Sequence, residues 1–256
     1  MNDFGELTGA AIVTGGSGGL GAAVCRLLAK RGSDVALTFR GNEEAARAVA
    51  ADIEADGGRA TVARLDLLDA DACAGFVAQA ASDHGGLHTL VHAAGPLVQQ
   101  RYLGTVPPAE FREHLDQECA GFFNVVHPAL PHLRATGGSI VAVTTAGTRR
   151  YPLRDGLSAG TKAAIESIVR ALAAEEGRYG VRANMVGPGM TMDGMAPKLV
   201  ASGDLHPDAL DAAMRNIPLR RFGDADDIAE AVCFLASPRA DYISGQKLDV
   251  DGGFGV

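Results

Sequence analysis

The sequence has few cysteines, no excess of positive charge and no long apolar run. Its four cysteines are scattered, with no CxxC pair and no histidine at ligand spacing: Cys25, Cys73, Cys119 and Cys233. This spacing argues against a zinc site and a disulfide framework, so we expect no bound metal and free thiols in a reducing compartment. The formal net charge of -8 offers no basic face for sequence-independent binding of nucleic acid.

Segments that would target or divide the chain are also missing. No apolar run approaches the ~18 residues of a membrane span, and the first residues lack the basic start of a signal peptide. No Pro/Ser-rich linker, low-complexity tract or internal repeat interrupts the sequence. We therefore expect a cytoplasmic protein that contacts no membrane, with one domain spanning residues 1–256.

What the sequence does contain is an alternation of short apolar runs with longer amphipathic ones. Strands are predicted at Ala10–Thr14, Asp34–Phe39, Arg59–Leu65, Thr89–His92, Ser139–Thr144, Val181–Val186 and Gln246–Val250. Helices are predicted from the Gly-rich turn to Lys30, and at Glu43–Ala55, Asp69–Ala81, Pro108–Leu133, Leu157–Arg178 and Ala225–Ala236. Continuous apolar strands separated by helices are typical of a parallel sheet covered on both faces. The pattern predicts an α/β fold with a doubly wound sheet.

Residues 187–218 interrupt the alternation, because they are rich in Gly, Pro and Met and contain no predicted strand. Ligands of open α/β sheets bind outside the carboxyl ends of the strands. We therefore interpret this stretch as a substrate lid rather than an inert connection.

A Gly-rich segment, TGGSGGLG at Thr14–Gly21, follows the first predicted strand and opens the first helix. Glycine at the turn lets the backbone come close to a pyrophosphate, and the helix N-terminus offers free N–H groups and a positive dipole end. We expect a dinucleotide-binding segment formed by Gly15, Ser17, Gly18, Gly19, Leu20 and Gly21. A merely tight turn is the alternative.

The second predicted strand is followed by Arg40, where a carboxylate would bind the ribose hydroxyls of NAD. A guanidinium suits a 2′-phosphate through charge-assisted hydrogen bonds, so Arg40 favours NADP(H), the alternative being a solvated surface charge. Asp66 and Leu67 follow the third strand and are candidates for the adenine edge and face. The fourth strand ends in small residues where a ribose and nicotinamide could pass: His92, Ala93, Ala94 and Gly95.

Taken together, these segments resemble the short-chain dehydrogenase/reductase family. The resemblance runs from Thr8 to Gly253 and rests on TGGSGGLG, HAAG, AGTKAA, VGPGMT and the tail ISGQKLDVDGG. It implies a Rossmann-like sheet of about seven strands, a nicotinamide cofactor, and a homodimer or homotetramer built through the helices near Pro108–Leu133 and Leu157–Arg178. It also places Lys162, Pro188, Gly189 and Thr191 at the cofactor.

The family's catalytic pattern is an Asn, a Ser, a Tyr, and a Lys four residues after the Tyr. Lys162 matches the Lys, but Ser158 stands at the Tyr position and Glu118 at the Asn position. The Ser position is filled by Thr145, or by Thr144 if the loop is one residue longer.

Two nearby groups are candidates to replace the missing phenol. Tyr151 is either a proton donor or an aromatic of the substrate pocket, and Glu118 is either an acid with a raised pKa or an ion-pair partner of Lys162.

A serine hydroxyl is far less acidic than a tyrosine, whose pKa starts near ~10, so the sequence disfavours ordinary ketone reduction. Reducing a C=C conjugated to a carbonyl gives an enolate that needs only hydrogen bonds to its oxygen, which Ser158, Thr145 and Lys162 could supply. The Ser-x-x-x-Lys pattern is similar to that of the 2,4-dienoyl-CoA reductase branch.

Three functions remain open. The first is an NADP(H)-dependent reductase of an activated C=C or C=O in an enone, an oxo compound or an enoyl thioester, so that the small-molecule substrate could be thioester-linked. The second is a reductase or dehydrogenase with Tyr151 or Glu118 as substitute acid. The third is a non-catalytic NADP(H)-binding sensor or assembly partner.

Overall fold

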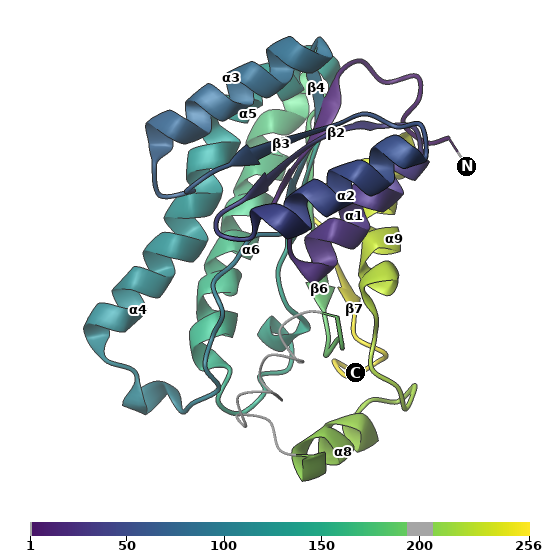
Figure 1. Ribbon diagram of the computed structural model, residues 1–256. Coiled ribbons are helices and arrows are strands. Elements are labelled where there is room, and N and C mark those ends of the chain that lie inside the picture. Colours follow the sequence, from purple (N-terminus) through teal and green to yellow (C-terminus); the bar gives the residue numbers. More distant parts are fainter. Residues whose placement is uncertain (1, 194–206) are drawn as a thin grey trace.

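The computed structural model describes residues 2–193 and 207–256 (Figure 1). Its centre is a seven-stranded sheet in the order β3-β2-β1-β4-β5-β6-β7, and every neighbouring pair is parallel. The strands are β1 Ala10–Thr14, β2 Asp34–Phe39, β3 Ala60–Arg64, β4 Leu87–His92, β5 Ser139–Val143, β6 Arg182–Pro188 and β7 Lys247–Val250. This confirms the predicted Rossmann-like α/β fold class.

Helices cover both faces of the sheet (Figure 1). The described helices are α1 Gly19–Lys30, α2 Glu43–Ala55, α3 Ala70–His84, α4 Pro108–Leu115, α5 Gly121–Thr136, α6 Gly156–Glu176, α8 Pro207–Asn216 and α9 Ala225–Ala236. Helices α1, α2 and α9 pack on one face, and α3, α5 and α6 pack on the other.

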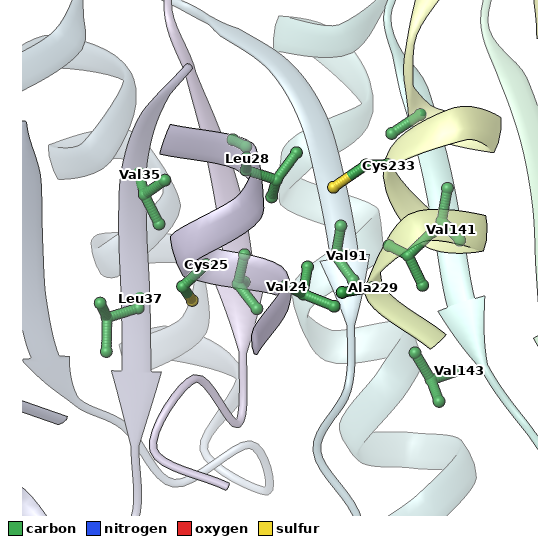
Figure 2. Packing of buried hydrophobic residues seen from close by; sticks show 14 of the residues in the cluster. Val24, Cys25, Leu28, Val35, Leu37, Val91, Val141, Val143, Ala229 and Cys233 are labelled. Carbon is green, nitrogen blue, oxygen red and sulfur yellow. The ribbon is translucent and has the colours of Figure 1, made fainter. Parts of the chain in front are cut away.

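Five strands, β1, β2, β4, β5 and β6, are largely apolar because each contributes to two cores. Successive side chains of a strand point to opposite faces. In β1, Ala11 and Val13 therefore join the core under α1 and α9, while Ala10 and Ile12 join the core under α3, α5 and α6. Figure 2 shows the first of these cores, where side chains of the two helices meet those of the central strands.

The strand order reverses between β1 and β4, the point at which open α/β sheets form a crevice. From β1 the chain proceeds outward through β2 and β3, and from β4 it proceeds the other way through β5, β6 and β7. The loops after β1 and β4 therefore diverge at the carboxyl ends of these two strands, which is where open α/β sheets bind ligands. The Gly-rich turn and the small residues after His92 both lie at this point.

Two predicted segments differ from the structure. Strand β6 continues through Gly187 and Pro188, which pair with Asp249 and Val250 of β7, so the stretch predicted as strand-free begins inside a strand. The same stretch contains helix α8, and its residues 194–206 lie outside the described residues. The substrate lid therefore stays a prediction.

The predicted helix Pro108–Leu133 is divided. A π-helical turn at Asp116–Ala120 separates α4 from α5, and α5 continues to Thr136. It ends there because Gly137 adopts a left-handed conformation, with φ of 62°. A π turn inserts one extra residue into a helix and is frequent at functional sites.

Within the described ranges, no helix combines the length and hydropathy needed to cross a bilayer. The same residues contain no group of three or more His, Cys, Asp or Glu side chains arranged to hold a metal ion. All four cysteines are free thiols.

Candidate active site

The Gly-rich turn lies directly against the segment that follows β4. Gly15 has φ of 72°, and a Cβ atom added to it would stand 2.7 Å from the Cα of Ala94. A Cβ on Gly21 would stand 2.3 Å from the carbonyl oxygen of Gly15. Both positions therefore exclude any side chain, and the start of α1 is held against its own turn and the end of β4.

The N-terminus of α1 fits an anion. Gly18 is the N-cap residue, and no described side chain caps this helix. The first backbone N–H groups of a helix have no partner within it and lie at the positive end of its dipole. The turn from Ser17 through Gly19 and Leu20 therefore presents donors to a pyrophosphate, and this cradle fits the dinucleotide that the sequence predicted.

Arg40 is exposed just after β2, next to a second guanidinium that sequence reasoning missed. Arg64 ends β3 in register with Phe39, and its Nε donates to the carbonyl oxygen of Arg40 at 3.3 Å. The signal was present in the sequence, because Arg64 ends the strand that neighbours β2. Two exposed cations thus lie together at the end of the crevice where an adenosine phosphate is expected.

Asp66 and Leu67 have defined local roles. The Asp66 carboxylate accepts from the backbone N–H of Leu68 at 3.1 Å, which shapes the turn after β3. The Leu67 carbonyl accepts from Nδ2 of Asn124 on α5 at 2.8 Å, and the Leu67 side chain packs against Gly121. The turn is therefore anchored to α5 and holds its place beside the crevice.

His92 is buried beneath the crevice. Its Nδ1 lies 2.9 Å from the Thr14 hydroxyl, and its ring meets Phe122 edge to face with 5.1 Å between centroids. Burial, with a smaller contribution from the Lys162 charge, lowers the pKa of His92 to about 3. The imidazole is therefore neutral, and it joins the ends of β1 and β4 below Ala93, Ala94 and Gly95.

The centre of the site is an ion pair between Lys162 of α6 and Glu118 of the π turn. The Lys162 ammonium donates to both carboxylate oxygens of Glu118, at 3.1 and 3.0 Å. The side chains are 11% and 1% exposed. The structure therefore shows Glu118 as an ion-pair partner of Lys162, one of the two roles considered for it.

This ion pair packs directly against Gly95, in the segment that follows β4. A Cβ on Gly95 would lie 3.1 Å from Oε1 of Glu118 and 3.5 Å from Nζ of Lys162. The segment after β4, the π turn and α6 therefore converge on one point next to the Gly-rich turn.

The hydroxyl residues of the predicted tetrad differ in how they are used. Thr144 is buried, and its hydroxyl donates to Oε1 of Glu166 at 3.1 Å. Thr145 Oγ1 accepts from the backbone N–H of Gly147 at 3.0 Å, so its own proton stays available to a ligand. Ser158 is buried on the same helix as Lys162, whereas Tyr151 is 63% exposed.

A buried polar cluster that the sequence analysis missed supports the Thr145 loop. Lys247 Nζ donates to the Thr145 carbonyl at 2.7 Å and lies 3.0 Å from carboxylate oxygens of both Glu166 and Asp249. A Cβ on Gly187 would stand 2.2 Å from Asp249 Oδ1, so the glycine leaves room for the cluster. A charged residue within a short predicted strand, at Lys247, was the available signal.

The VGPGMT segment continues from β6 into the same edge of the sheet. Gly189 donates to the carbonyl of Val250 at 2.9 Å, and a Cβ on it would stand 2.6 Å from the Cα of Asp251. Thr191 is buried and forms a bridge with Gly223. With Pro188 at the end of β6, these residues lie beyond the carboxyl end of the strand, where the resemblance places the cofactor.

One further acid lies at the site and was missed by sequence reasoning. Asp155 is the N-cap residue of α6, and its carboxylate accepts from Nε2 of Gln100 at 3.3 Å. The signal was its spacing, since Asp155, Ser158 and Lys162 stand at helical intervals of three and four residues.

Comparison with known proteins agrees with this architecture. A family profile described as "Enoyl-(Acyl carrier protein) reductase" matches residues 15–255. The chain is 33% identical to the 3-oxoacyl-[acyl-carrier-protein] reductase FabG of Staphylococcus aureus, over 97% of this chain and 98% of that protein. It is 35% identical to the 2,5-dichloro-2,5-cyclohexadiene-1,4-diol dehydrogenase LinX of Sphingobium indicum, over 96% of both chains.

A solved short-chain dehydrogenase from Burkholderia cenocepacia J2315, in complex with NADP, has a TM-score of 0.87 and 33% identity. The structural alignment covers 98% of this chain and 99% of the Burkholderia chain. The fold, the glycine turn and the match along nearly the whole chain define an oxidoreductase. The chain belongs to the short-chain dehydrogenase/reductase family.

Proposed function

We propose that this protein is an NADP(H)-dependent reductase that transfers hydride to an activated C=C or C=O bond, with an atypical set of active-site residues. The observation that carries the proposal is the Lys162–Glu118 ion pair against Gly95, at the carboxyl end of β4 and next to the glycine turn. A buried ammonium at this crevice is suited to hold a ribose and to stabilise negative charge on a nearby oxygen.

NADPH, when bound, supplies the hydride, and the chain's own groups stabilise the charge that develops on the substrate oxygen. The Thr145 hydroxyl accepts from the backbone N–H of Gly147, which leaves its own proton free to be donated to the substrate oxygen. Ser158 adds a second hydroxyl from α6, one helical turn before Lys162. Fixed donors in a partly dehydrated site favour a carbonyl oxygen that becomes anionic as the carbon is reduced.

The substrate class follows from the same chemistry. A polarised carbonyl, an enone or an enoyl thioester develops charge on an oxygen that these donors can hold. The similarity to a reductase named for 3-oxoacyl groups on acyl carrier protein supports an acyl thioester as substrate.

The test is stopped-flow NADPH oxidation against matched panels of ketones, enones and 3-oxoacyl and enoyl thioesters. We expect turnover on at least one activated substrate. Tight NADPH binding without turnover on every panel would instead support a non-catalytic sensor or assembly partner. The observation that favours this second function is the ion pair with Glu118, because it occupies the ammonium of Lys162.

Arg40 tests the cofactor preference. Changing Arg40 to Asp removes a cation and adds an anion, and a charge-assisted hydrogen bond contributes about 1.5–3 kcal/mol. We expect NADPH affinity to fall roughly ten- to hundredfold, with little loss of NADH affinity, measured by fluorescence titration of both cofactors. Arg112→Asp, an equal charge change on the exposed side of α4, is the control. An unchanged NADPH/NADH ratio in the Arg40 variant would show that Arg40 is only a surface charge.

We also propose that the protein forms a homodimer or homotetramer through α4, α5 and α6. Phe111 of α4 and Phe123 of α5 are 41% and 46% exposed, and large exposed aromatics are enriched in protein interfaces. Sedimentation of the wild type against Phe123→Glu tests this. Dissociation of the variant is expected, and a monomeric wild type would refute the proposal.

A further inference from the structure

Asp155 lies on the same helical face as two residues of the site. It is the N-cap residue of α6, Ser158 follows three residues later and Lys162 follows four residues after that. Residues at these intervals lie above one another on a helix. Ser158 and Lys162 are buried, and Asp155 is half-buried at the open end of this row.

The Asp155 carboxylate does not cap the helix that it begins. An N-cap aspartate ordinarily accepts from backbone N–H groups of the first turn, but no described side chain, that of Asp155 included, caps α6. Its Oδ1 instead accepts from Gln100 at 3.3 Å. Its Oδ2 and the Thr145 hydroxyl both lie beside Gly147, on the loop after β5. A Cβ atom added to Gly147 would stand 3.2 Å from each of these two oxygens.

The segment after β4 holds this arrangement in place through three other contacts. The backbone N–H of Arg101 donates to the carbonyl of Arg154 at 3.0 Å, and the Arg154 guanidinium lies 5.2 Å from the centre of the Tyr102 ring. Leu103 packs against Gly156. Gln100 is therefore presented to Asp155 by a loop that is docked on the start of α6.

We propose that Asp155 is the proton donor of this active site, positioned by Gln100 and delivering its proton to the substrate oxygen held by Thr145 and Ser158. The inference rests on the proposed function and deepens it, because a site with its own acid is equipped to reduce a carbonyl as well as a conjugated C=C.

Other groups at the site are less suited to this role. Both carboxylate oxygens of Glu118 already accept hydrogen bonds from the Lys162 ammonium. Tyr151 is largely exposed to solvent. A serine hydroxyl such as that of Ser158 is too weak an acid to donate its proton readily.

The surroundings of Asp155 make it a usable acid near neutral pH. Burial raises its pKa to about 6, opposed by the Lys162 charge and by the Gln100 hydrogen bond. The neighbouring cation, Arg154, is directed onto Tyr102. A donor works best when its pKa lies near the working pH, and the carboxyl keeps one side open to water for reprotonation.

The step balances without any further reactant. The hydride carries two electrons from the reduced nicotinamide to the substrate carbon, and the π bond of the C=O opens toward oxygen. The O–H bond of Asp155 breaks as a new O–H bond forms on that oxygen. The product is the alcohol, the cofactor is left oxidised, and the Asp155 carboxylate regains a proton from solvent.

Asp155→Asn tests the role, because the amide keeps the shape of the side chain but has no acidic proton. General acids contribute about 10²–10⁴-fold, so we expect kcat on a carbonyl substrate to fall by about 10²-fold or more. For the wild type we expect kcat/KM to decline as pH rises above about 6, and we expect this decline to vanish in the variant. NADPH affinity should be unchanged, and Asp71→Asn, an exposed aspartate on α3, is the control for the substitution itself.

Gln100→Leu is the matched positioning variant. Its hydrogen bond lowers the pKa of Asp155, so removing it raises that pKa and should move the decline in rate to higher pH. A merely structural role for Gln100 would lower the rate at every pH and leave the profile in place.

Stability gives a readout that needs neither cofactor nor substrate. The folded-state pKa of about 6 lies above the value near 3.9 of an unfolded chain. The folded state therefore binds more protons between these values, and its stability declines as pH rises through that window. Urea unfolding should show Asp155→Asn gaining stability over the wild type from pH 4 to pH 7, and Asp71→Asn should show no such gain.

The outcomes separate the two proposals. A wild type that reduces carbonyls while Asp155→Asn keeps both its rate and its pH profile would overturn the proton-donor role alone. A wild type that binds NADPH but reduces nothing would overturn the proposed function and this inference with it. Loss of the rate, loss of the pH dependence and the gain in stability together would establish Asp155 as the acid.

Discussion

Replacing Lys162 with methionine is expected to lower the free energy of unfolding by about 3–5 kcal/mol and to reduce turnover at least a hundredfold. The stability loss follows because the variant leaves the Glu118 carboxylate, which is only 1% exposed, without its partner. The rate loss follows if Lys162 also stabilises charge on the reacting oxygen. Urea unfolding and stopped-flow NADPH oxidation measure the two effects separately.

The double variant Lys162→Met/Glu118→Gln distinguishes these contributions. Removing both charges should restore most of the lost stability, because no uncompensated carboxylate remains. Turnover should stay low, since the ammonium is still missing. Recovery of turnover in the double variant would show that Lys162 matters for folding only. Arg221→Met is the control, since its partner Asp227 lies in a more exposed pair and surface pairs contribute about 0–1 kcal/mol.

Replacing Lys247 with methionine is expected to cost about 3–5 kcal/mol of stability as well, and to lower turnover without changing NADPH affinity. The variant leaves the carboxylates of Glu166 and Asp249 without the ammonium that they share. Arg170 stays 3.7 Å from Glu166 but is 54% exposed, so its compensation is weak. Turnover should fall because Lys247 also holds the carbonyl of Thr145.

The matched control for Lys247 is Arg47→Met. Arg47 pairs with Glu43 on the surface of α2, with side chains 71% and 54% exposed. Such a pair contributes about 0.3–0.5 kcal/mol, so this variant should unfold almost like the wild type. Equal losses for Lys247→Met and Arg47→Met would show that the buried cluster contributes no more than a surface pair.

The fold was readable from the sequence where burial dictates composition. Strands β1 and β2 are apolar on both faces, and helices α2 and α9 begin directly after capping residues, so their predicted bounds match the structure. Elements set by long-range pairing were less readable. Gly187 and Pro188 belong to β6 only because β7 pairs with them, and neither residue has a strong strand preference.

The site was readable where a residue type is tied to a known pattern. Lys162 and Glu118 were found through the spacing of the family motif, and the structure brings them into contact. Asp155 and Lys247 were missed because an aspartate at a helix start ordinarily indicates a cap, and a lysine in a terminal strand ordinarily indicates a solvated edge. Their partners, Gln100 and Glu166, lie 55 and 81 positions away in the chain, and only the fold joins them.

The π turn at Asp116–Ala120 has a consequence for helical phase. Each α-helical residue advances about 100° around the axis, so one inserted residue rotates everything before it by that angle relative to everything after it. The insertion lets α5 present Phe122, Val125 and Val126 to the sheet while Glu118 turns toward Lys162. Deleting one residue of the turn would restore a regular helix but rotate the residues before the turn by about 100° relative to α5. Either the apolar face of α5 would then turn away from the sheet, or Glu118 would turn away from Lys162.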